Sequence, residues 1–281
     1  MRDVIMAVDG QSKLITRHRL IEGIGYFLKA DPDWTKQQLI YPLQSDDKEA
    51  LILWQAAARR TLFMGALGHI GDEVVKRVAD SRLPRETRKS LLFSLTVEAM
   101  HAFREKRQPA VPNVRLQQLL RTVEESLRSS AANSVQKYVR DVDNEEPRAL
   151  IFTTAAKPFL QQVWPQERSL TSRSVSAAFA DLPATAGESF CDAVETIARF
   201  LVPFDCWSML DYGLYGADKL QAINTAEMAS ALLKLLDLTV GQAQSSVIPH
   251  DLSEALSTID AVMPALRVDP RYRRLAAAAR R

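Results

Sequence analysis

The sequence has little cysteine, histidine or glycine, and these shortages exclude several classes of protein. The 281 residues contain only two cysteines, Cys191 and Cys206, too few for a disulfide framework, and we expect both to be buried, reduced thiols. The four histidines are scattered, whereas a structural zinc site needs four clustered ligands. With ten glycines and 25% charged residues, the chain is neither collagen-like nor disordered. We therefore expect a folded protein that binds no metal.

Long apolar runs are missing as well. The run from Val4 to Val8 is too short for the core of a signal peptide. The longest uncharged stretch, from Leu238 to His250, contains Gln, Ser and Thr, whereas a spanning helix needs about 20 apolar residues. We therefore expect a cytoplasmic protein that does not enter the membrane. The formal net charge of +2 gives no global reason to expect a nucleic-acid partner.

The motifs that mark common active sites are absent. The sequence has no P-loop, and Gly23-Ile-Gly25 lacks the third glycine of a dinucleotide-binding turn. The glycines between Gly65 and Gly71 lie between helical patterns and predict a helix–helix turn or a point of close packing. A nucleophile elbow and a His-Glu-x-x-His pattern are also missing. We assign no catalytic residue, no cofactor-binding residue and no metal ligand.

Three acidic patterns could mark a metal-binding or catalytic site, but each has a structural interpretation. Glu98-Ala-Met-His101 resembles half of a di-iron motif, but a second Glu-x-x-His pair is missing, so His101 is expected to be a partly exposed helix residue. Asp46-Asp47 precedes a helical stretch and predicts a helix cap. Glu124-Glu125 is expected on a solvated helix face.

The pattern that is present is helical periodicity. Three apolar stripes have the spacing of one helix face: Leu116, Leu120, Val123 and Leu127; Phe190, Val194, Ile197 and Leu201; and Leu252, Leu256, Ile259, Met263 and Leu266. Most of the thirteen prolines fall between such stretches, where they mark helix boundaries. Strand content should be close to zero.

We predict an all-α fold, either an α-solenoid or an irregular helical-repeat array of about a dozen helices, with an irregular bundle as the alternative. Residues 1–281 are expected to form one domain. The acidic segment 141–147 is expected to be a turn between helices, with a boundary between lobes as the alternative. The residues 113–140, 205–215 and 219–242 are each predicted to be one helix.

Two segments are strongly basic. Residues Arg82–Arg128 carry ten basic and five acidic side chains, and Arg267–Arg281 carries six arginines and one aspartate. Such segments can bind phosphates, but aromatic residues are not interleaved with the charges as in a stacking platform. We therefore expect solvated helix faces. The four tryptophans should be mostly core, and an exposed one could anchor a partner.

Several segments resemble the C-terminal helical region of large bacterial proteins, which often carry a sirtuin-like or related effector domain at their other end. The resemblance lies in Pro158–Ser169, Phe190–Ile197, Leu201-Val-Pro203, Asp31–Trp34, Glu49–Gln55 and Leu266–Leu275. Several of those proteins belong to anti-phage defence systems. The resemblance implies a helical scaffold without catalytic residues and a role in defence by association. Since no effector domain precedes the helices, it implies a separate subunit, or a fragment or second product of a longer gene.

These observations favour a non-enzymatic helical scaffold or sensor module that mediates protein–protein interaction in a bacterial anti-phage defence system. Its partner would be a protein, either a large effector enzyme or a phage protein, and it could also self-associate. The alternative is a nucleic-acid-binding helical-repeat protein that uses Arg82–Arg128 and Arg267–Arg281. An enzyme whose site is assembled from distant side chains is a third reading.

Overall fold

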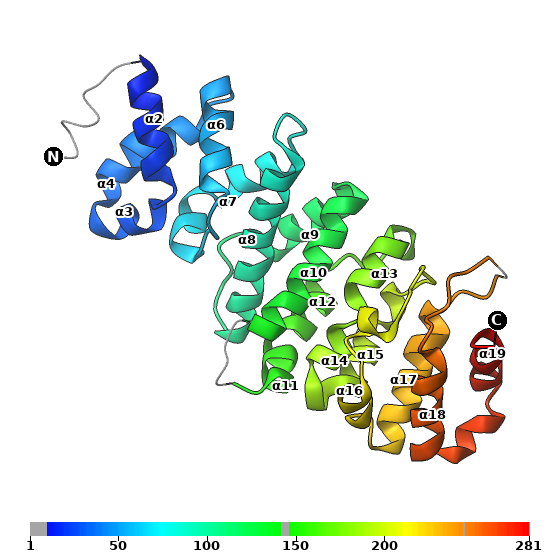
Figure 1. Ribbon diagram of the computed structural model, residues 1–281. Coiled ribbons are helices and arrows are strands. Elements are labelled where there is room, and N and C mark those ends of the chain that lie inside the picture. Colours follow the sequence, from blue (N-terminus) through cyan, green and yellow to red (C-terminus); the bar gives the residue numbers. More distant parts are fainter. Residues whose placement is uncertain (1–9, 142–145, 244, 281) are drawn as a thin grey trace. The chain divides into compact units, whose positions relative to one another are not determined.

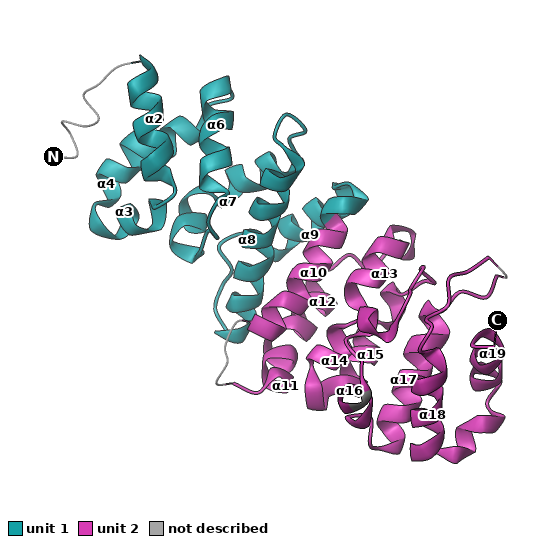
Figure 2. Cartoon of the chain, viewed as in Figure 1, with its two compact units in different colours: residues 1–127 teal, residues 128–281 magenta. Residues whose placement is uncertain are grey.

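The computed structural model describes residues 10–141, 146–243 and 245–280, and Figure 1 shows their arrangement. Helices with short connections make up this part of the chain, which contains no strand. The predicted all-α helical array is therefore confirmed. The chain forms two compact units, unit 1 (Met1–Leu127) and unit 2 (Arg128–Arg281), coloured separately in Figure 2.

In unit 1, α7 packs along α8, the next helix in the chain, whereas α2 packs on α6, from which α3, α4 and α5 separate it in the sequence. Its helices are α2 (Gly10–Ile21), α3 (Ile24–Ala30), α4 (Pro32–Thr35), α5 (Tyr41–Gln44), α6 (Lys48–Ala57), α7 (Met64–Ala79), α8 (Arg85–Arg104) and α9 (Asn113–Thr122).

Unit 2 begins within α10 (Glu125–Asp141). It continues with α11 (Arg148–Ile151), α12 (Lys157–Gln162), α13 (Arg173–Phe179), α14 (Leu182–Thr185), α15 (Phe190–Ile197), α16 (Ala217–Gln221), α17 (Ala226–Thr239), α18 (Leu252–Val262) and α19 (Pro270–Ala278). Short 3₁₀ turns lie at Arg168–Leu170, Gly187–Ser189, Ala198–Phe200, Met209–Tyr212 and Pro264–Val268. Helix α17 lies at the centre of the C-terminal part, since α15, α18 and α19 all pack on it.

Each unit has its own apolar core. In unit 1, Trp54 is fully buried and its indole Nε1 donates to the carbonyl of Leu43 over 2.9 Å. In unit 2, Trp164 packs edge-on against Phe179, with ring centroids 4.9 Å apart, and both rings contact Phe200. Such ring pairs stabilise a core beyond the effect of the buried area alone.

Side-chain caps fix where several helices begin. Asp47 accepts a hydrogen bond from the backbone N–H of Ala50 over 2.8 Å at the start of α6, which confirms the predicted cap. Ser172 and Thr225 cap α13 and α17 in the same way. Each such cap satisfies a backbone donor that the helix itself leaves unpaired, and contributes about 1 kcal/mol.

Two prolines, Pro42 and Pro158, lie inside continuous helical segments. Pro42 and Pro158 each follow a π-turn, at Lys36–Ile40 and Phe152–Ala156. A proline cannot donate to the carbonyl four residues before it, and its ring clashes with that group. The wider π-turn relieves the clash. The carbonyl freed by Pro42 belongs to Gln38, and Arg17 Nε donates to it over 3.1 Å.

Two long predicted helices are divided. Residues 113–140 form α9 and α10, because the backbone of Val123 turns extended at the end of α9. Residues 219–242 form the end of α16 and the separate helix α17. The predicted turn or boundary at 141–147 includes residues 142–145, which lie outside the described residues, so this prediction and that of a single domain stay open. The two compact units divide at Leu127–Arg128.

Among the residues that the structure describes, none of the helices is both long and apolar enough to cross a membrane.

Asp181, in the turn before α14, is expected to make the stability of unit 2 depend on pH. Burial raises the pKa of its carboxyl to about 6, from an ordinary value of 3.8. The folded state thus binds the proton of this carboxyl more tightly than the unfolded state does. The contribution of this tighter proton binding to the stability of the fold is complete below about pH 4 and is lost as the pH rises through about 6. We expect Asp181→Asn to raise the free energy of unfolding at pH 7.5 by about 1–2 kcal/mol, with no gain at pH 4.

Urea unfolding at the two pH values tests this expectation. Asp141→Asn is the control, because the hydrogen bond from Arg140 lowers the pKa of Asp141 and the substitution should bring no gain at either pH. An equal gain for Asp181→Asn at both pH values would contradict the expected pH dependence.

Candidate interaction surface

The patterns that the sequence offered as sites have structural roles. Glu98 is 3% exposed and accepts hydrogen bonds from Arg107 Nη1 over 2.6 Å and from the backbone N–H of Ala110. It therefore fixes the connection after α8. His101 is a half-buried residue of α8, as expected, and burial lowers its pKa. Within the described residues, no group of three or more His, Cys, Asp or Glu side chains could hold a metal ion.

The two acidic pairs also take part in structural contacts. Whereas Asp47 caps α6, its neighbour Asp46 lies 2.9 Å from Arg77 and 2.5 Å from Arg82, in salt bridges that join the start of α6 to the end of α7. Glu124 lies between α9 and α10 and pairs loosely with Arg85 and Arg88, at 3.5 and 3.6 Å. These contacts use the carboxylates to join helices.

The basic segment Arg82–Arg128 is largely neutralised within unit 1. At least six of its ten basic residues form salt bridges, namely Arg82, Arg85, Arg88, Lys89, Arg107 and Arg115. Arg88 is also buried and donates to the carbonyl of Val78 over 2.7 Å. Little of the positive charge counted in the sequence is therefore available to phosphates.

The C-terminal basic segment is paired in a similar way. Arg267 binds Asp260, Arg271 binds Asp269 over 2.8 Å, and Arg274 binds Asp237 over 2.9 Å. Arg274 also donates to the backbone carbonyl of Val240 and so fastens α19 to the end of α17. These arginines hold the C-terminal helix in place.

The four tryptophans differ sharply in exposure, which the sequence did not indicate. Trp54 and Trp164 are buried, and Trp34 is half-buried. Trp207 is 74% exposed, and Leu210 and Tyr215, close to it in the chain, are 66% and 58% exposed. All three belong to residues 205–216, here called the Trp207 loop. A large aromatic side chain in water is the commonest anchor of a protein–protein contact.

The Trp207 loop was predicted to be a helix, and the structure shows that this prediction is wrong. Only Met209–Tyr212 is helical, as one 3₁₀ turn. Gly213 ends this turn at φ +67°, with a Cβ position 3.2 Å from Ala184, so the site favours glycine both in conformation and in space. The buried residues Cys206, Met209 and Tyr212 recur every three positions, which is the period of a 3₁₀ helix.

The backbone of the Trp207 loop is anchored at several points. His250 donates its backbone N–H to the carbonyl of Trp207 over 3.0 Å, and its Nδ1 lies 2.7 Å from the same oxygen. The buried carboxylate of Asp251 accepts from the backbone N–H of Met209 over 2.8 Å. Under the loop, the hydroxyl of Tyr212 lies 2.9 Å from Thr239 Oγ1. The exposed indole is therefore carried by a backbone that needs little ordering when a partner binds.

Both cysteines are free thiols, but only Cys206 is buried as predicted, since Cys191 is half-buried. Burial raises the pKa of the Cys206 thiol to about 12, and its Sγ donates to the carbonyl of Ser208. A thiol held in its protonated form is a poor nucleophile. Cys206 therefore serves to anchor the Trp207 loop.

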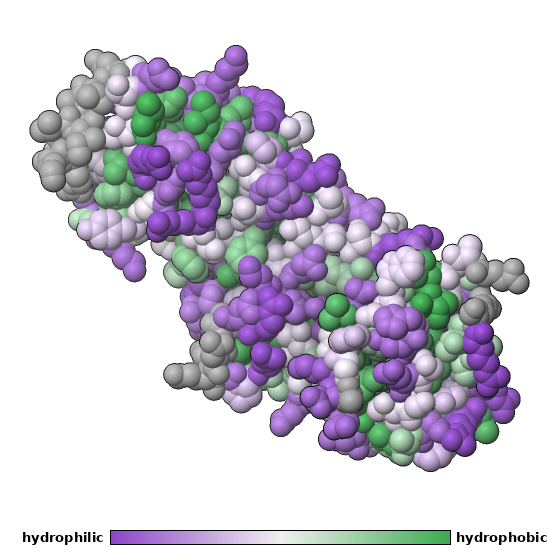
Figure 3. Space-filling model, in the orientation of Figure 1, coloured by the Kyte–Doolittle hydropathy of each residue, from purple (hydrophilic) through white to green (hydrophobic). Residues whose placement is uncertain are grey.

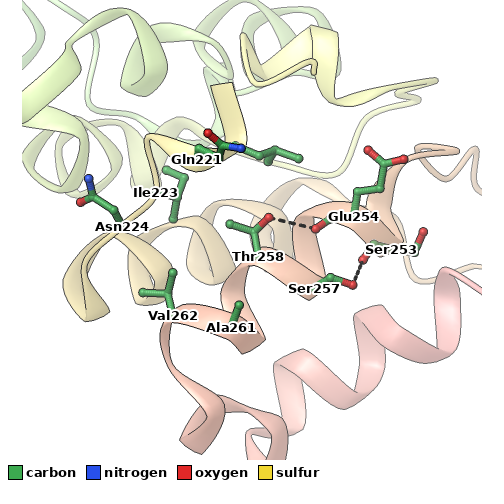
Figure 4. A pocket seen from close by; sticks show the side chains of 10 residues that line it. Gln221, Ile223, Asn224, Ser253, Glu254, Ser257, Thr258, Ala261 and Val262 are labelled. Carbon is green, nitrogen blue, oxygen red and sulfur yellow. Dashed lines mark hydrogen bonds between the residues drawn. The ribbon is translucent and has the colours of Figure 1, made fainter. Parts of the chain in front are cut away.

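A groove of about 760 Å³ lies between α18 and the segment formed by the end of α16 and the connection to α17 (Figure 4). Its apolar floor includes Leu220 and Ile223, and hydroxyl groups of α18 line one wall. Ser257 and Thr258 donate to carbonyls of their own helix, at 2.8 and 3.1 Å. Their hydroxyl oxygens thus remain as acceptors toward the groove.

Unit 1 exposes apolar side chains of its own. On the face seen in Figure 3, apolar surface gathers over α2 and α6. Ile15 of α2 and Ile52 of α6 are 57% and 41% exposed. These side chains are aliphatic and lie on regular helices, so they lack the rigid aromatic character of the Trp207 loop.

No family model matches the chain. It is similar to uncharacterized protein y4cA of Sinorhizobium fredii (strain NBRC 101917 / NGR234), with 29% identity over 163 residues, which is 56% of this chain. The match covers only 13% of the length of that relative, which is a much longer protein.

Proposed function

We propose that the chain is a non-enzymatic helical scaffold or sensor module that binds a protein partner through the Trp207 loop. The observation that carries the proposal is the exposed indole of Trp207 on a backbone held by His250 and Asp251. Burying such a side chain against a partner contributes strongly to affinity, and the preformed loop keeps the entropic cost low.

The proposal includes a role in a bacterial anti-phage defence system, as a subunit or as part of a larger protein. Its support is the resemblance of the helical segments and the similarity to a stretch of a much longer bacterial protein. It also includes a cytoplasmic location, supported by two free cysteines. The alternative of nucleic-acid binding is weakened by the salt bridges that neutralise the basic segments.

A pull-down from the native host with the tagged wild-type chain and its Trp207→Ala variant tests the proposal. We expect the variant to retain at most about a tenth of the partner, since loss of an anchor residue costs about 2 kcal/mol or more of binding energy. Nuclease treatment should leave the wild-type complex intact.

Two controls make the result specific. Tyr41→Ala removes another exposed aromatic side chain, from unit 1 (58% exposed), and should leave partner retention unchanged. The melting temperature of Trp207→Ala should equal that of the wild type, since the indole contributes little to the core. Equal retention by wild type and Trp207→Ala would remove the loop from the interface. A signal lost on nuclease treatment would favour the nucleic-acid alternative.

Phage infection tests the defence part separately. Deletion of the gene should raise the plating efficiency of at least one phage of the host, and Trp207→Ala should reproduce the deletion. Unchanged plating across a broad phage panel would overturn the defence role and leave the interaction role standing.

A further inference from the structure

Unit 1 contains a second groove, of about 590 Å³, between α3 and the start of α7. Buried apolar residues form its floor, among them Ile24, Leu28, Leu62 and Ala66. Tyr26 and Phe63 stand at its rim with 71% and 60% of their surface exposed. This size and this mixture of an apolar floor with aromatic walls are typical of a site that takes a few side chains.

Two glycines keep this groove open. A Cβ atom built at Gly25 or at Gly65 would meet no other atom within 4 Å, and both residues line the groove. Gly71, on the same helix as Gly65, differs, because its Cβ would come within 2.5 Å of Val111 and close packing explains it. Close packing therefore does not explain Gly65, and the open space at this position leaves room for an occupant of the groove.

The groove also carries uncompensated positive charge. Lys29 and Arg60 line it and are exposed, and neither forms a salt bridge with any described residue. This contrasts with the paired arginines of the basic segments. The carboxylate of Glu22 lies in the wall, but Arg59 neutralises it over 2.7 Å. The groove thus offers two free cations beside apolar and aromatic surface.

We propose that the groove binds an acidic peptide segment of another protein, with an apolar side chain seated over Gly65 and carboxylates facing Lys29 and Arg60. The apolar floor favours a peptide over a nucleic acid, because aliphatic or aromatic side chains of a peptide would be buried against it. The site lies in unit 1 and is independent of the Trp207 loop in unit 2.

Fluorescence anisotropy with a fluorescein-labelled peptide of sequence Glu-Asp-Leu-Phe-Asp-Glu tests the proposal on the full chain. The decisive variant is Gly65→Leu, which adds a bulky side chain at a residue that lines the groove. The matched control is Gly68→Leu, three residues along the same helix, where a Cβ also meets open space but the residue does not line the groove. Both variants should fold, because replacing a helical glycine tends to stabilise.

We expect Gly65→Leu to weaken peptide binding by at least about tenfold and Gly68→Leu to change it by less than about twofold. Lys29→Glu with Arg60→Glu should also weaken binding by about tenfold or more, since it reverses both free charges. A peptide with lysines in place of the acids should bind more weakly than the acidic one. Equal binding by both leucine variants, tighter binding of a single-stranded oligothymidine, or no peptide binding near 1 mM would each overturn the proposal.

Discussion

Replacing Glu98 with alanine is expected to lower the free energy of unfolding of unit 1 by about 3–5 kcal/mol. The carboxylate is almost fully buried and binds both the guanidinium of Arg107 and the backbone N–H of Ala110. Its removal leaves the backbone donor of Ala110 without its partner and takes from the partly buried Arg107 its buried carboxylate, so that only the exposed carboxylate of Glu105 still pairs with this cation. Urea unfolding followed by tryptophan fluorescence measures the change.

Glu105 supplies the matched control. It pairs with the same arginine, over 2.5 Å to Nε, but its side chain is 53% exposed. An exposed ion pair contributes little, so Glu105→Ala should cost less than about 1 kcal/mol. An equal loss of stability in Glu98→Ala and Glu105→Ala would show that burial does not make the contacts of Glu98 stronger than those of Glu105.

The second large effect is expected at Tyr212, beneath the Trp207 loop. Its ring is fully buried, and Tyr212→Ala should cost about 3–5 kcal/mol, as other deletions of buried aromatic rings do. Tyr212→Phe removes only the hydroxyl that lies 2.9 Å from Thr239 Oγ1, and should cost about 1 kcal/mol. Chemical denaturation measures both changes.

Tyr215 is the control for this pair of variants. It lies three positions further along the same loop and is 58% exposed, so Tyr215→Ala should change the free energy of unfolding by less than about 0.5 kcal/mol. Limited proteolysis adds a local readout, because Tyr212→Ala should expose residues 205–216 to cleavage. A loop that stayed resistant in Tyr212→Ala would show that its other anchors suffice.

Much of the helical core could be predicted from spacing alone. The stripe of Phe190, Val194, Ile197 and Leu201 is buried throughout, and so is that of Leu116 to Leu127. Spacing could not reveal the break in the helix at Val123. Val123, at the break, and Leu127, after it, are both buried, as they would be in one continuous helix. The same apolar pattern fits one helix or two.

The π-turns have a sequence signal of their own, which is a row of apolar residues spaced four apart and not the 3.6-residue period of a regular α-helix. Ile151, Ala155, Phe159 and Val163 are all buried and lie four residues apart. In a regular α-helix such a row drifts by about 40° around the axis at each step. The π-turn at Phe152–Ala156 contains an extra residue in its turn, which returns the row to one face. In this segment, a strict period of four combined with a proline two residues after the π-turn is thus a signal that the sequence contains.

The candidate surfaces were beyond prediction for a different reason. Apolar side chains drive both burial and recognition, so composition cannot tell Trp54 from Trp207. The difference arises from contacts far apart in the sequence, such as the 43-residue separation between Trp207 and His250. Likewise, the neutralisation of Arg107 by Glu98 depends on the fold of the intervening connection, and counting charges along the chain misses it.

The exposure of Trp207 has an optical consequence. Small quenchers in solution reach an indole only where water does, and three of the four indoles are fully or partly shielded by the fold. The quenchable part of the intrinsic fluorescence therefore comes mainly from Trp207, on the very loop that is proposed to meet a partner. Trp207 is therefore an intrinsic fluorescent probe of that surface, and no dye has to be attached to the chain.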